Sequence, residues 1–385
     1  MSKSVYIGSF EDMSGKAAPM FGLMELATKK YRKVAIFRPI ITKAKDKAIE
    51  TVLEKFGLGM DYADTYAFTM DEARDLLNAG KHEYLIESVI KKFKALEKAY
   101  DFVLCVGTDF KPATAAFEFG LNSDFALNTA SPMLLVVNAA GQEPEEVRDA
   151  VLMALGQLRE GCVDVLGVIL NKSSLTADEA KTVAAELQKQ AELGAGLGVY
   201  NVPLSACSGE SCLMTKIQAG EATVEQAVAE FTAAVDGAEM LKRIEGFQTR
   251  RITPKMFEYQ LLEKAQARKM RIVLPEGEDE RVLKAADDLL RREVAALAIL
   301  GDEDKIKADA KRLGLDLSKA QLVNPAKAAN LQVYAETYAG LRKHTGVTVE
   351  QARQTMADPT YYGTMMVYKG DMDGMVSGAL NTTAN

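Results

Sequence analysis

Two short segments of the chain carry residue types that bind phosphate. The first, Gly8–Lys16, lies between an apolar run and an amphipathic run, where backbone N–H groups and a helix dipole would converge on an anion. The second follows a short apolar run and holds Ser377, Gly378, Thr382 and Thr383. Its hydroxyl and backbone N–H groups are phosphate donors, and glycine allows close backbone approach. A strand-end turn with polar caps is the alternative interpretation of this second segment.

The first segment departs from a loop that hydrolyses nucleotides. Gly15-Lys16 resembles the end of a Walker A motif, but Phe10 stands where that motif has Gly. Ala17 stands where the motif has the Ser or Thr that holds magnesium, and Asp12 adds a negative charge that would repel a polyphosphate. We therefore predict a degenerate nucleotide loop, with the residues Gly8, Ser14, Gly15, Lys16, Asn171 and Lys172.

Apolar runs alternate with amphipathic runs along the first 240 residues. The apolar runs are short and nearly continuous, as expected for strands buried on both faces, and lie at 5–7, 34–37, 102–106, 133–137, 165–170 and 199–202. Capping boxes predict helices that begin after Thr69, Thr176, Thr223 and Thr348, and Glu143-Pro144 opens another. This alternation predicts βαβ crossovers and a mainly parallel sheet.

Residues 1–240 resemble a dethiobiotin-synthetase-like, P-loop-related domain. Asn171-Lys172 follows a strand and resembles the pair that contacts a nucleotide base, while Val106 stands where related proteins carry an acid. With magnesium ligand and acid both replaced, we expect a P-loop-NTPase-like fold that does not turn over ATP and has a structural or regulatory role. An ATP-dependent ligase of the dethiobiotin-synthetase type is a weaker alternative.

A second α/β unit is expected to begin near residue 250. Strands are predicted at 271–274, 297–300 and 375–376, and a helix at 278–292. Thr253-Pro254 caps a further helix whose apolar face carries Phe257, Leu261 and Ala265. We predict that Asp373 orients the segment around the last strand rather than acting as a base.

The second unit closely resembles the phosphate acetyltransferase (phosphotransacetylase) family. Three runs carry the resemblance: GFQTRRITPKMFEY at 246–259, RIVLPEG at 271–277 and DMDGMVSGALNTTAN at 371–385. The resemblance implies the reaction of acetyl-CoA with phosphate to give acetyl phosphate and CoA, by direct transfer in a ternary complex without metal or other cofactor. It also implies that phosphate binds at Ser377, Gly378, Thr382 and Thr383.

The resemblance divides the chain into three parts, and the third is expected to be incomplete. These parts are the P-loop-like domain at 1–240, a linker and helix at 241–269, and the beginning of the transferase domain at 270–385. The family's transferase fold resembles isocitrate and isopropylmalate dehydrogenases. Its base and key arginines are expected beyond Asn385, so we predict no catalytic residue within this chain and no activity from it alone. The regulatory domain that many long bacterial forms insert is expected to be absent.

Composition excludes several classes of protein and leaves one alternative function open. A net charge of −7, from 47 basic and 54 acidic residues, argues against nucleic-acid binding. Four Cys and two His without paired spacing disfavour a disulfide framework or a metal site. No apolar run reaches the ~18 residues of a membrane span, so we predict a cytoplasmic protein. The family is homo-oligomeric, and the same is expected here. The alternative is a non-catalytic protein that binds a nucleotide or a partner through the P-loop-like domain.

Overall fold

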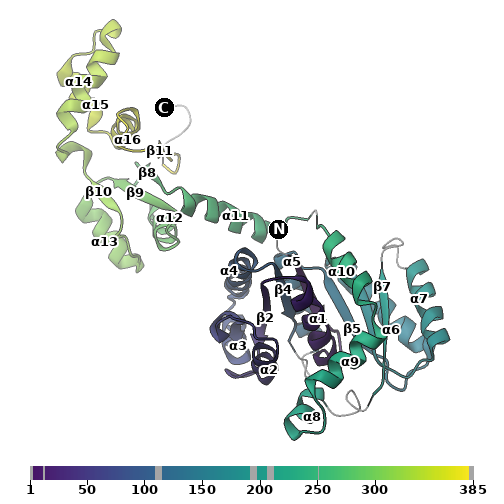
Figure 1. The fold of residues 1–385 in the computed structure, drawn as a ribbon. Helices are drawn as coiled ribbons and strands as arrows, with labels where there is room; N and C mark the ends of the chain where they lie inside the picture. Colours follow the sequence, from purple (N-terminus) through teal and green to yellow (C-terminus); the bar gives the residue numbers. More distant parts are fainter. Residues whose placement is uncertain are drawn as a thin grey trace. The chain divides into compact units, whose positions relative to one another are not determined.

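The chain folds into two compact units, Met1–Phe257 and Glu258–Asn385 (Figure 1). The computed structural model describes residues 3–11, 14–108, 115–190, 197–205, 212–249 and 251–380. The division after Phe257 falls inside the segment 241–269 that the sequence suggests as linker and helix. No helix within the described ranges is long and apolar enough to cross a membrane.

The first unit is built on a parallel sheet. In its described part the sheet has the strand order β3-β2-β4-β1-β5-β6-β7, and every pairing is parallel. The strands are β1 Lys3–Gly8, β2 Val34–Ile41, β3 Tyr66–Thr69, β4 Phe102–Val106, β5 Met133–Asn138, β6 Val165–Ser173 and β7 Gly198–Pro203. The parallel α/β sheet predicted from the sequence is therefore confirmed.

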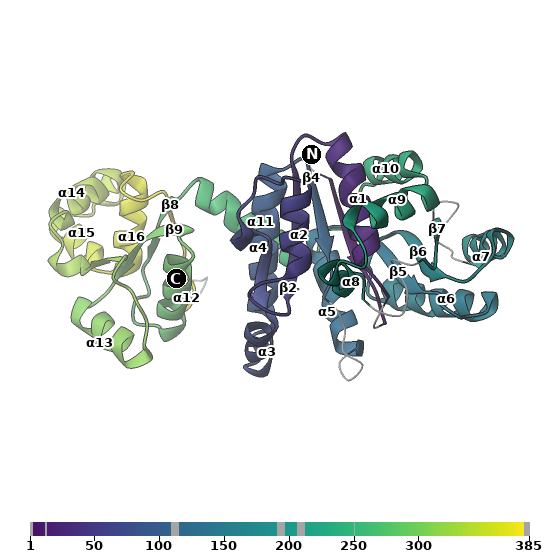
Figure 2. The ribbon, with the colours of Figure 1, turned by 60° about the horizontal axis from the view of Figure 1, so that its bottom comes forward.

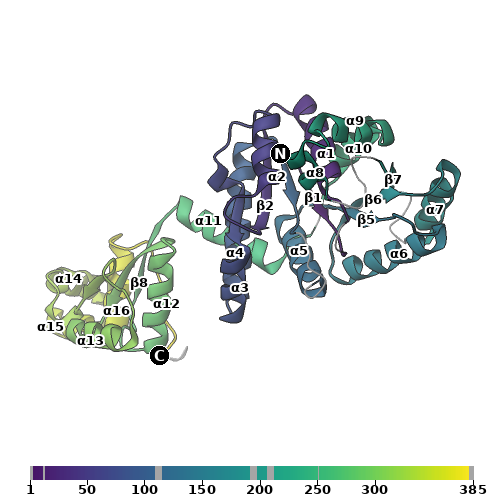
Figure 3. The same cartoon turned by 90° about the horizontal axis from the view of Figure 1, so that it is seen from below.

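Helices cover both faces of this sheet, which explains why its strands are apolar on both sides. Figure 3 shows α1, α9 and α10 together on one face, with α5 and α6 on the other. Figure 2 shows the same two layers. The helices are α1 Ala17–Lys30, α2 Lys47–Lys55, α3 Met70–Asn78, α4 His82–Ala99, α5 Ala115–Thr129, α6 Pro144–Glu160, α7 Ala177–Gln190, α8 Leu213–Ala219, α9 Val224–Ala234 and α10 Gly237–Gly246, with a 3-10 turn η1 at Tyr62–Asp64.

Local sequence signals located most of these elements. The capping boxes at Thr69, Thr223 and Thr348 form as predicted, and Thr176 exchanges the same hydrogen bonds with Glu179. All six predicted strands of the first unit are present, most of them longer than the apolar run. The strand of the first unit that was not predicted from the sequence is β3, whose four residues are only partly buried at the edge of the sheet.

The second unit has a smaller parallel sheet with the order β10-β9-β8-β11. Its strands are β8 Met270–Leu274, β9 Ala295–Leu300, β10 Gln321–Val323 and β11 Gly374–Met375. The helices from the boundary onward are α11 Pro254–Ala267, α12 Glu280–Arg291, α13 Glu303–Leu313, α14 Leu331–Leu341, α15 Val349–Met356 and α16 Pro359–Tyr368, with 3-10 turns η3 Pro325–Lys327 and η4 Lys343–Thr345.

Alternation along the strands gives this sheet two separate cores. Val273 packs with α14, α15 and α16, whereas the next residue, Leu274, packs with α12 and α13. Ala298 and Ile299 on β9 divide in the same way. The sheet is thus covered by helices on both faces, as Figure 1 shows.

One predicted apolar face is not buried. Phe257 and Leu261 on α11 were expected to pack inward, yet their side chains are 55% and 50% exposed. Met256 is the residue of this helix that is buried. Helical periodicity identifies a stripe of apolar side chains, but burial of the stripe requires a partner surface.

Candidate functional site

The second sheet reverses its strand order next to β8, and this is where an open α/β sheet binds ligands. From β8 the chain moves to β9 and β10 on one side, whereas β11 pairs with β8 on the other side. Gly374 lies beside Ile272 and Met375 beside Val273 in parallel register. The segments that follow β8 and β11 therefore leave the sheet at the same carboxyl edge, at a topological switch point.

The Glu276 carboxylate binds the backbone of the segment after β11. Its Oε2 accepts hydrogen bonds from Gly378 N and Ala379 N, both at 2.9 Å, and its Oε1 accepts one from Leu380 N at 2.7 Å. Glu276 is only 6% exposed. Successive N–H groups that converge in this way form a backbone nest for an anion, and here the anion is a side chain of the chain itself.

Arg281 forms a second connection between the two loops. Its Nη2 donates to the carbonyl of Ala379 at 2.8 Å, and its guanidinium forms a two-pronged ion pair with Asp279. The hydrogen bonds from Arg281 lower the pKa of Asp279 to about 2. Asp279 also caps α12 by accepting from Arg281 N. Glu276 in the loop after β8 thus binds the N–H of Ala379, and Arg281 in the first turn of α12 binds its carbonyl.

Asp373 is anchored at the start of β11 by Arg271. The Arg271 Nη2 lies 2.6 Å from Oδ1, and the Arg271 backbone N lies 2.8 Å from Oδ2. These bonds lower the pKa of Asp373 to about 2. A carboxylate held in this way immediately before β11 is consistent with the predicted orienting role.

The predicted phosphate-site residues lie at this edge as far as the structure describes them. Ser377 is exposed and lies two positions after the end of β11, and Gly378 has a φ of +122° that side chains rarely adopt. Thr382 and Thr383 lie outside the described residues. A cavity of about 480 Å³ adjoins Ser377 and Glu276, and it is otherwise lined mainly by apolar side chains of β8, β9 and α12.

Glu276 belongs to the run RIVLPEG at 271–277 that carries the family resemblance, but the sequence does not show what its side chain binds. Its partners lie more than a hundred positions later in the chain, at 378–380. The sequence shows only that a carboxylate stands between a strand and a tight turn. It does not show that three backbone N–H groups about a hundred positions later donate to that carboxylate.

The degenerate loop of the first unit closes on the end of β6. The Asn171 side-chain amide donates to the carbonyls of Ser14 and Gly15, at 2.7 and 3.1 Å. Gly15 has a φ of +79°, and a Cβ placed there would lie 2.6 Å from Asn171 Nδ2. The structure therefore brings Ser14, Gly15 and Asn171 together, with Lys172 beside them. The Oδ1 atom of Asn171 is buried and accepts no hydrogen bond from the part of the chain that is described.

Two lysines of the loop are buried. Lys16 Nζ donates to the carbonyl of Thr108, just beyond β4, at 2.5 Å. Burial lowers the pKa of Lys172, whose backbone has a φ of +55°. Gly8 ends β1, where a Cβ would lie 2.8 Å from the Met133 sulfur. The ammonium group of Lys16 therefore reaches a backbone oxygen at the carboxyl edge of the sheet.

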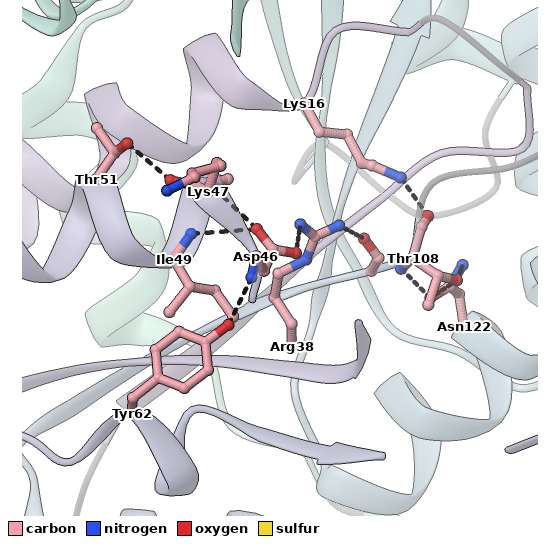
Figure 4. A network of polar contacts seen from close by, with 11 residues as sticks. Lys16, Arg38, Asp46, Lys47, Ile49, Thr51, Tyr62, Thr108 and Asn122 are labelled. Atoms are coloured by element: carbon pink, nitrogen blue, oxygen red, sulfur yellow. Dashed lines mark hydrogen bonds and ion pairs between the residues drawn. The ribbon is translucent and has the colours of Figure 1, made fainter. Parts of the chain in front are cut away.

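A buried ion pair adjoins this loop (Figure 4). Arg38 Nη1 lies 2.6 Å from Asp46 Oδ2, and the two side chains are 6% and 9% exposed. Arg38 Nη2 also donates to the carbonyl of Gly107 at 3.5 Å, next to the residue that Lys16 contacts. Asp46 Oδ1 caps α2 by accepting from Ala48 N. Sequence analysis missed this pair, because its two members lie in a strand and in a later loop.

Metal ligation has little support in the described ranges. No group of three or more His, Cys, Asp or Glu side chains is placed there to hold a metal ion. Cys105 is buried, and burial raises the pKa of its thiol well above the usual range. The absence of a cofactor stays a prediction.

Comparison with known proteins separates the chain into the same two regions. The family described as phosphate acetyl/butaryl transferase matches residues 256–385, and the family described as an AAA domain matches residues 3–195. A phosphotransacetylase structure from Staphylococcus aureus is 40% identical over 32% of this chain and 39% of its own, with a TM-score of 0.31.

Two curated relatives match the whole chain. The phosphate acetyltransferase of Synechocystis is 28% identical over 505 positions, which cover 100% of this chain and 72% of that protein. The phosphate acetyltransferase of Nitratidesulfovibrio vulgaris is 33% identical over 506 positions, again covering 100% of this chain and 72% of the relative. Both alignments are longer than this chain of 385 residues, so each relative carries positions without a counterpart here. From this identity and coverage, the chain belongs to the phosphate acetyltransferase family.

Proposed function

We propose that the protein acts in the transfer of an acetyl group between CoA and inorganic phosphate. The observation that carries this proposal is the 33% identity to a phosphate acetyltransferase across the full chain. The edge formed by the ends of β8 and β11 supports it, because Ser377 and its neighbours leave the sheet at a switch point suited to a ligand. In this proposal Ser377, Gly378, Thr382 and Thr383 form the phosphate side of the site.

The chemistry sets out what such a site must supply. Phosphate must be bound while it attacks the thioester carbonyl, whose developing oxyanion needs hydrogen-bond donors. The CoA thiolate that leaves must then be stabilised or protonated. Within the second unit, the Ser377 hydroxyl is an exposed donor at the sheet edge and suits the first task.

The direct test follows loss of the acetyl-CoA thioester with and without inorganic phosphate, alongside calorimetric titration of each substrate. Phosphate-dependent turnover would support the function. Binding of acetyl-CoA and phosphate without turnover would support the identity of the two substrates. It would also agree with the expectation that this chain alone is inactive. Absence of binding for both substrates would contradict the proposal.

A matched pair of variants localises the phosphate side. Removal of the hydroxyl in S377A is expected to weaken phosphate binding about tenfold, because a hydrogen bond to a charged group is lost. S318A removes an exposed hydroxyl after α13 and serves as the control. Equal phosphate affinity in S377A and S318A would exclude Ser377 from the site.

For the first unit, we propose a structural or regulatory role without ATP hydrolysis. Ala17 offers no hydroxyl for magnesium, and Lys16 contacts the Thr108 carbonyl. Magnesium-dependent ATP hydrolysis by the chain would contradict this role. The alternative function is a non-catalytic protein that binds a nucleotide or a partner through this unit, and the buried Asn171 Oδ1 beside Gly15 favours the nucleotide. Calorimetry with ATP and NADH tests it, and binding of either without binding of acetyl-CoA or phosphate would favour the alternative.

We also propose a cytoplasmic homo-oligomer that needs no metal or other cofactor and binds neither nucleic acid nor membrane. The resemblance to a homo-oligomeric family supports self-association, and the net charge of −7 argues against nucleic-acid binding. Sedimentation at several concentrations tests self-association. Elemental analysis of the purified protein tests the absence of a metal, and a stoichiometric bound metal ion would contradict it.

A further inference from the structure

We propose that Glu276 is a positioning residue, which shapes the segment after β11 by occupying its backbone nest with a carboxylate. This inference rests on the proposed function, because it gives the segment its role at the phosphate side. The three contacts run from the N–H groups of Gly378, Ala379 and Leu380 to the two carboxylate oxygens, at 2.7–2.9 Å.

The contact needs a negative charge and two acceptor oxygens. Three N–H groups point at one carboxylate, and such charge-assisted hydrogen bonds are stronger than neutral ones. A glutamine at position 276 would keep one oxygen and add an amide group that is itself a donor. At 6% exposure, water competes little for these contacts. The charge of Glu276 is therefore matched to the nest.

The contact also decides which donors remain for an incoming phosphate. The N–H groups of 378–380 are already occupied, and the carbonyl of Ala379 is taken by Arg281. A phosphate that approaches this edge meets the exposed Ser377 side chain, while the backbone behind it is fixed by Glu276. Gly378 then serves the site through its φ of +122°, which lets the chain turn into the nest.

Hydrogen–deuterium exchange of the full chain tests the structural half of this inference without requiring turnover. In E276Q and E276A, the amides of 378–380 are expected to exchange at least about tenfold faster, as hydrogen bonds to a charged acceptor are lost. E278Q, in the same loop, is the matched control, because the exposed Glu278 pairs with Lys305 instead. Unchanged exchange in both Glu276 variants, or faster exchange throughout the second unit, would overturn the proposal.

Chemical rescue separates positioning from general destabilisation. Formate is a small carboxylate that fits the space vacated in E276A, so high formate is expected to restore slow exchange at 378–380 in that variant. Formate should leave E276Q unchanged, because the glutamine side chain still fills the space. Absence of rescue in a folded E276A protein would overturn the proposal.

The functional half uses phosphate itself. E276Q is expected to weaken phosphate binding or raise its KM about tenfold, with the KM for acetyl-CoA unchanged, whereas E278Q behaves as the parent protein. Equal effects on both substrates would overturn the positioning role. If the parent protein neither binds nor uses phosphate, the proposed function fails, while the exchange result still decides whether Glu276 holds the nest.

Discussion

Arg271 donates hydrogen bonds to the Asp373 carboxylate from both its guanidinium and its backbone N–H, although the two residues are 102 positions apart in the sequence. The pair fastens the start of β8 to the start of β11, and the Arg271 carbonyl in turn accepts from Asp373 N at 2.8 Å. The two segments that form the phosphate-side edge are therefore aligned by a side chain at the opposite end of their strands.

The first prediction concerns the acid stability of this pair. The pKa of Asp373 falls from 3.8 to about 2 on folding, so its contribution is fully present above about pH 4 and is lost as the pH falls toward 2. D373N should lower the melting temperature at pH 6, and the difference from the parent should shrink between pH 4 and pH 2. Calorimetric scans at several pH values check this. A difference that stays constant down to pH 2 would contradict it.

The second prediction concerns the buried pair of the first unit. R38M leaves the Asp46 carboxylate buried without its cation, and loss of one partner of such a pair costs about 3–5 kcal/mol of unfolding free energy. R74M is the control, because Arg74 and Asp71 are exposed and such pairs contribute about 0–1 kcal/mol. Denaturant unfolding followed by circular dichroism measures both. Similar losses in the two variants would refute the importance of the Arg38–Asp46 pair.

A third prediction concerns Gly15 in the degenerate loop. G15A places a methyl group 2.6 Å from Asn171 Nδ2 at a φ of +79°. The left-handed backbone alone costs about 1–2 kcal/mol, and overpacking adds about 1–3 kcal/mol. G141A has a φ of +65° with no atom within 4 Å, so it isolates the backbone cost. Chemical denaturation measures the free energy of unfolding of both variants. If G141A lowers it as much as G15A does, crowding against Asn171 does not contribute to the cost at Gly15.

The packing of α1 against α9 supports a fourth prediction. A Cβ at Gly22 would lie 2.0 Å from Phe231 Cδ1, so G22A should destabilise the first unit by about 1–3 kcal/mol. Gly156 lies exposed in α6 with no atom within 4 Å of the new Cβ, so G156A should stabilise it by about 0.5–1 kcal/mol. Opposite shifts in melting temperature are expected. Equal shifts in melting temperature for G22A and G156A would contradict the prediction, because they would show that Phe231 moves away from the new methyl group at little cost in free energy.

Much of the local structure followed from the sequence because its causes are local. A capping box such as Thr223 with Gln226 joins residues three positions apart, and the structure forms it. The strand at 102–106 is apolar at every position because helices cover both of its faces. Where burial depends on a distant surface, the same reasoning failed, as on α11 with Phe257 and Leu261.

The sequence by itself determined the alternation of strands and helices, the degenerate character of the Gly15-Lys16 loop and the resemblance to the family. Only the tertiary structure decided what the charged groups contact. Glu276 meets the amides of 378–380, and Arg38 meets Asp46 and the carbonyl of Gly107. The physical reason is that hydrogen bonds and ion pairs act over a few ångströms, whereas strand order brings together segments far apart in the chain. Periodicity and capping report a residue's own neighbourhood, and they carry no information about which distant segment will share its sheet edge.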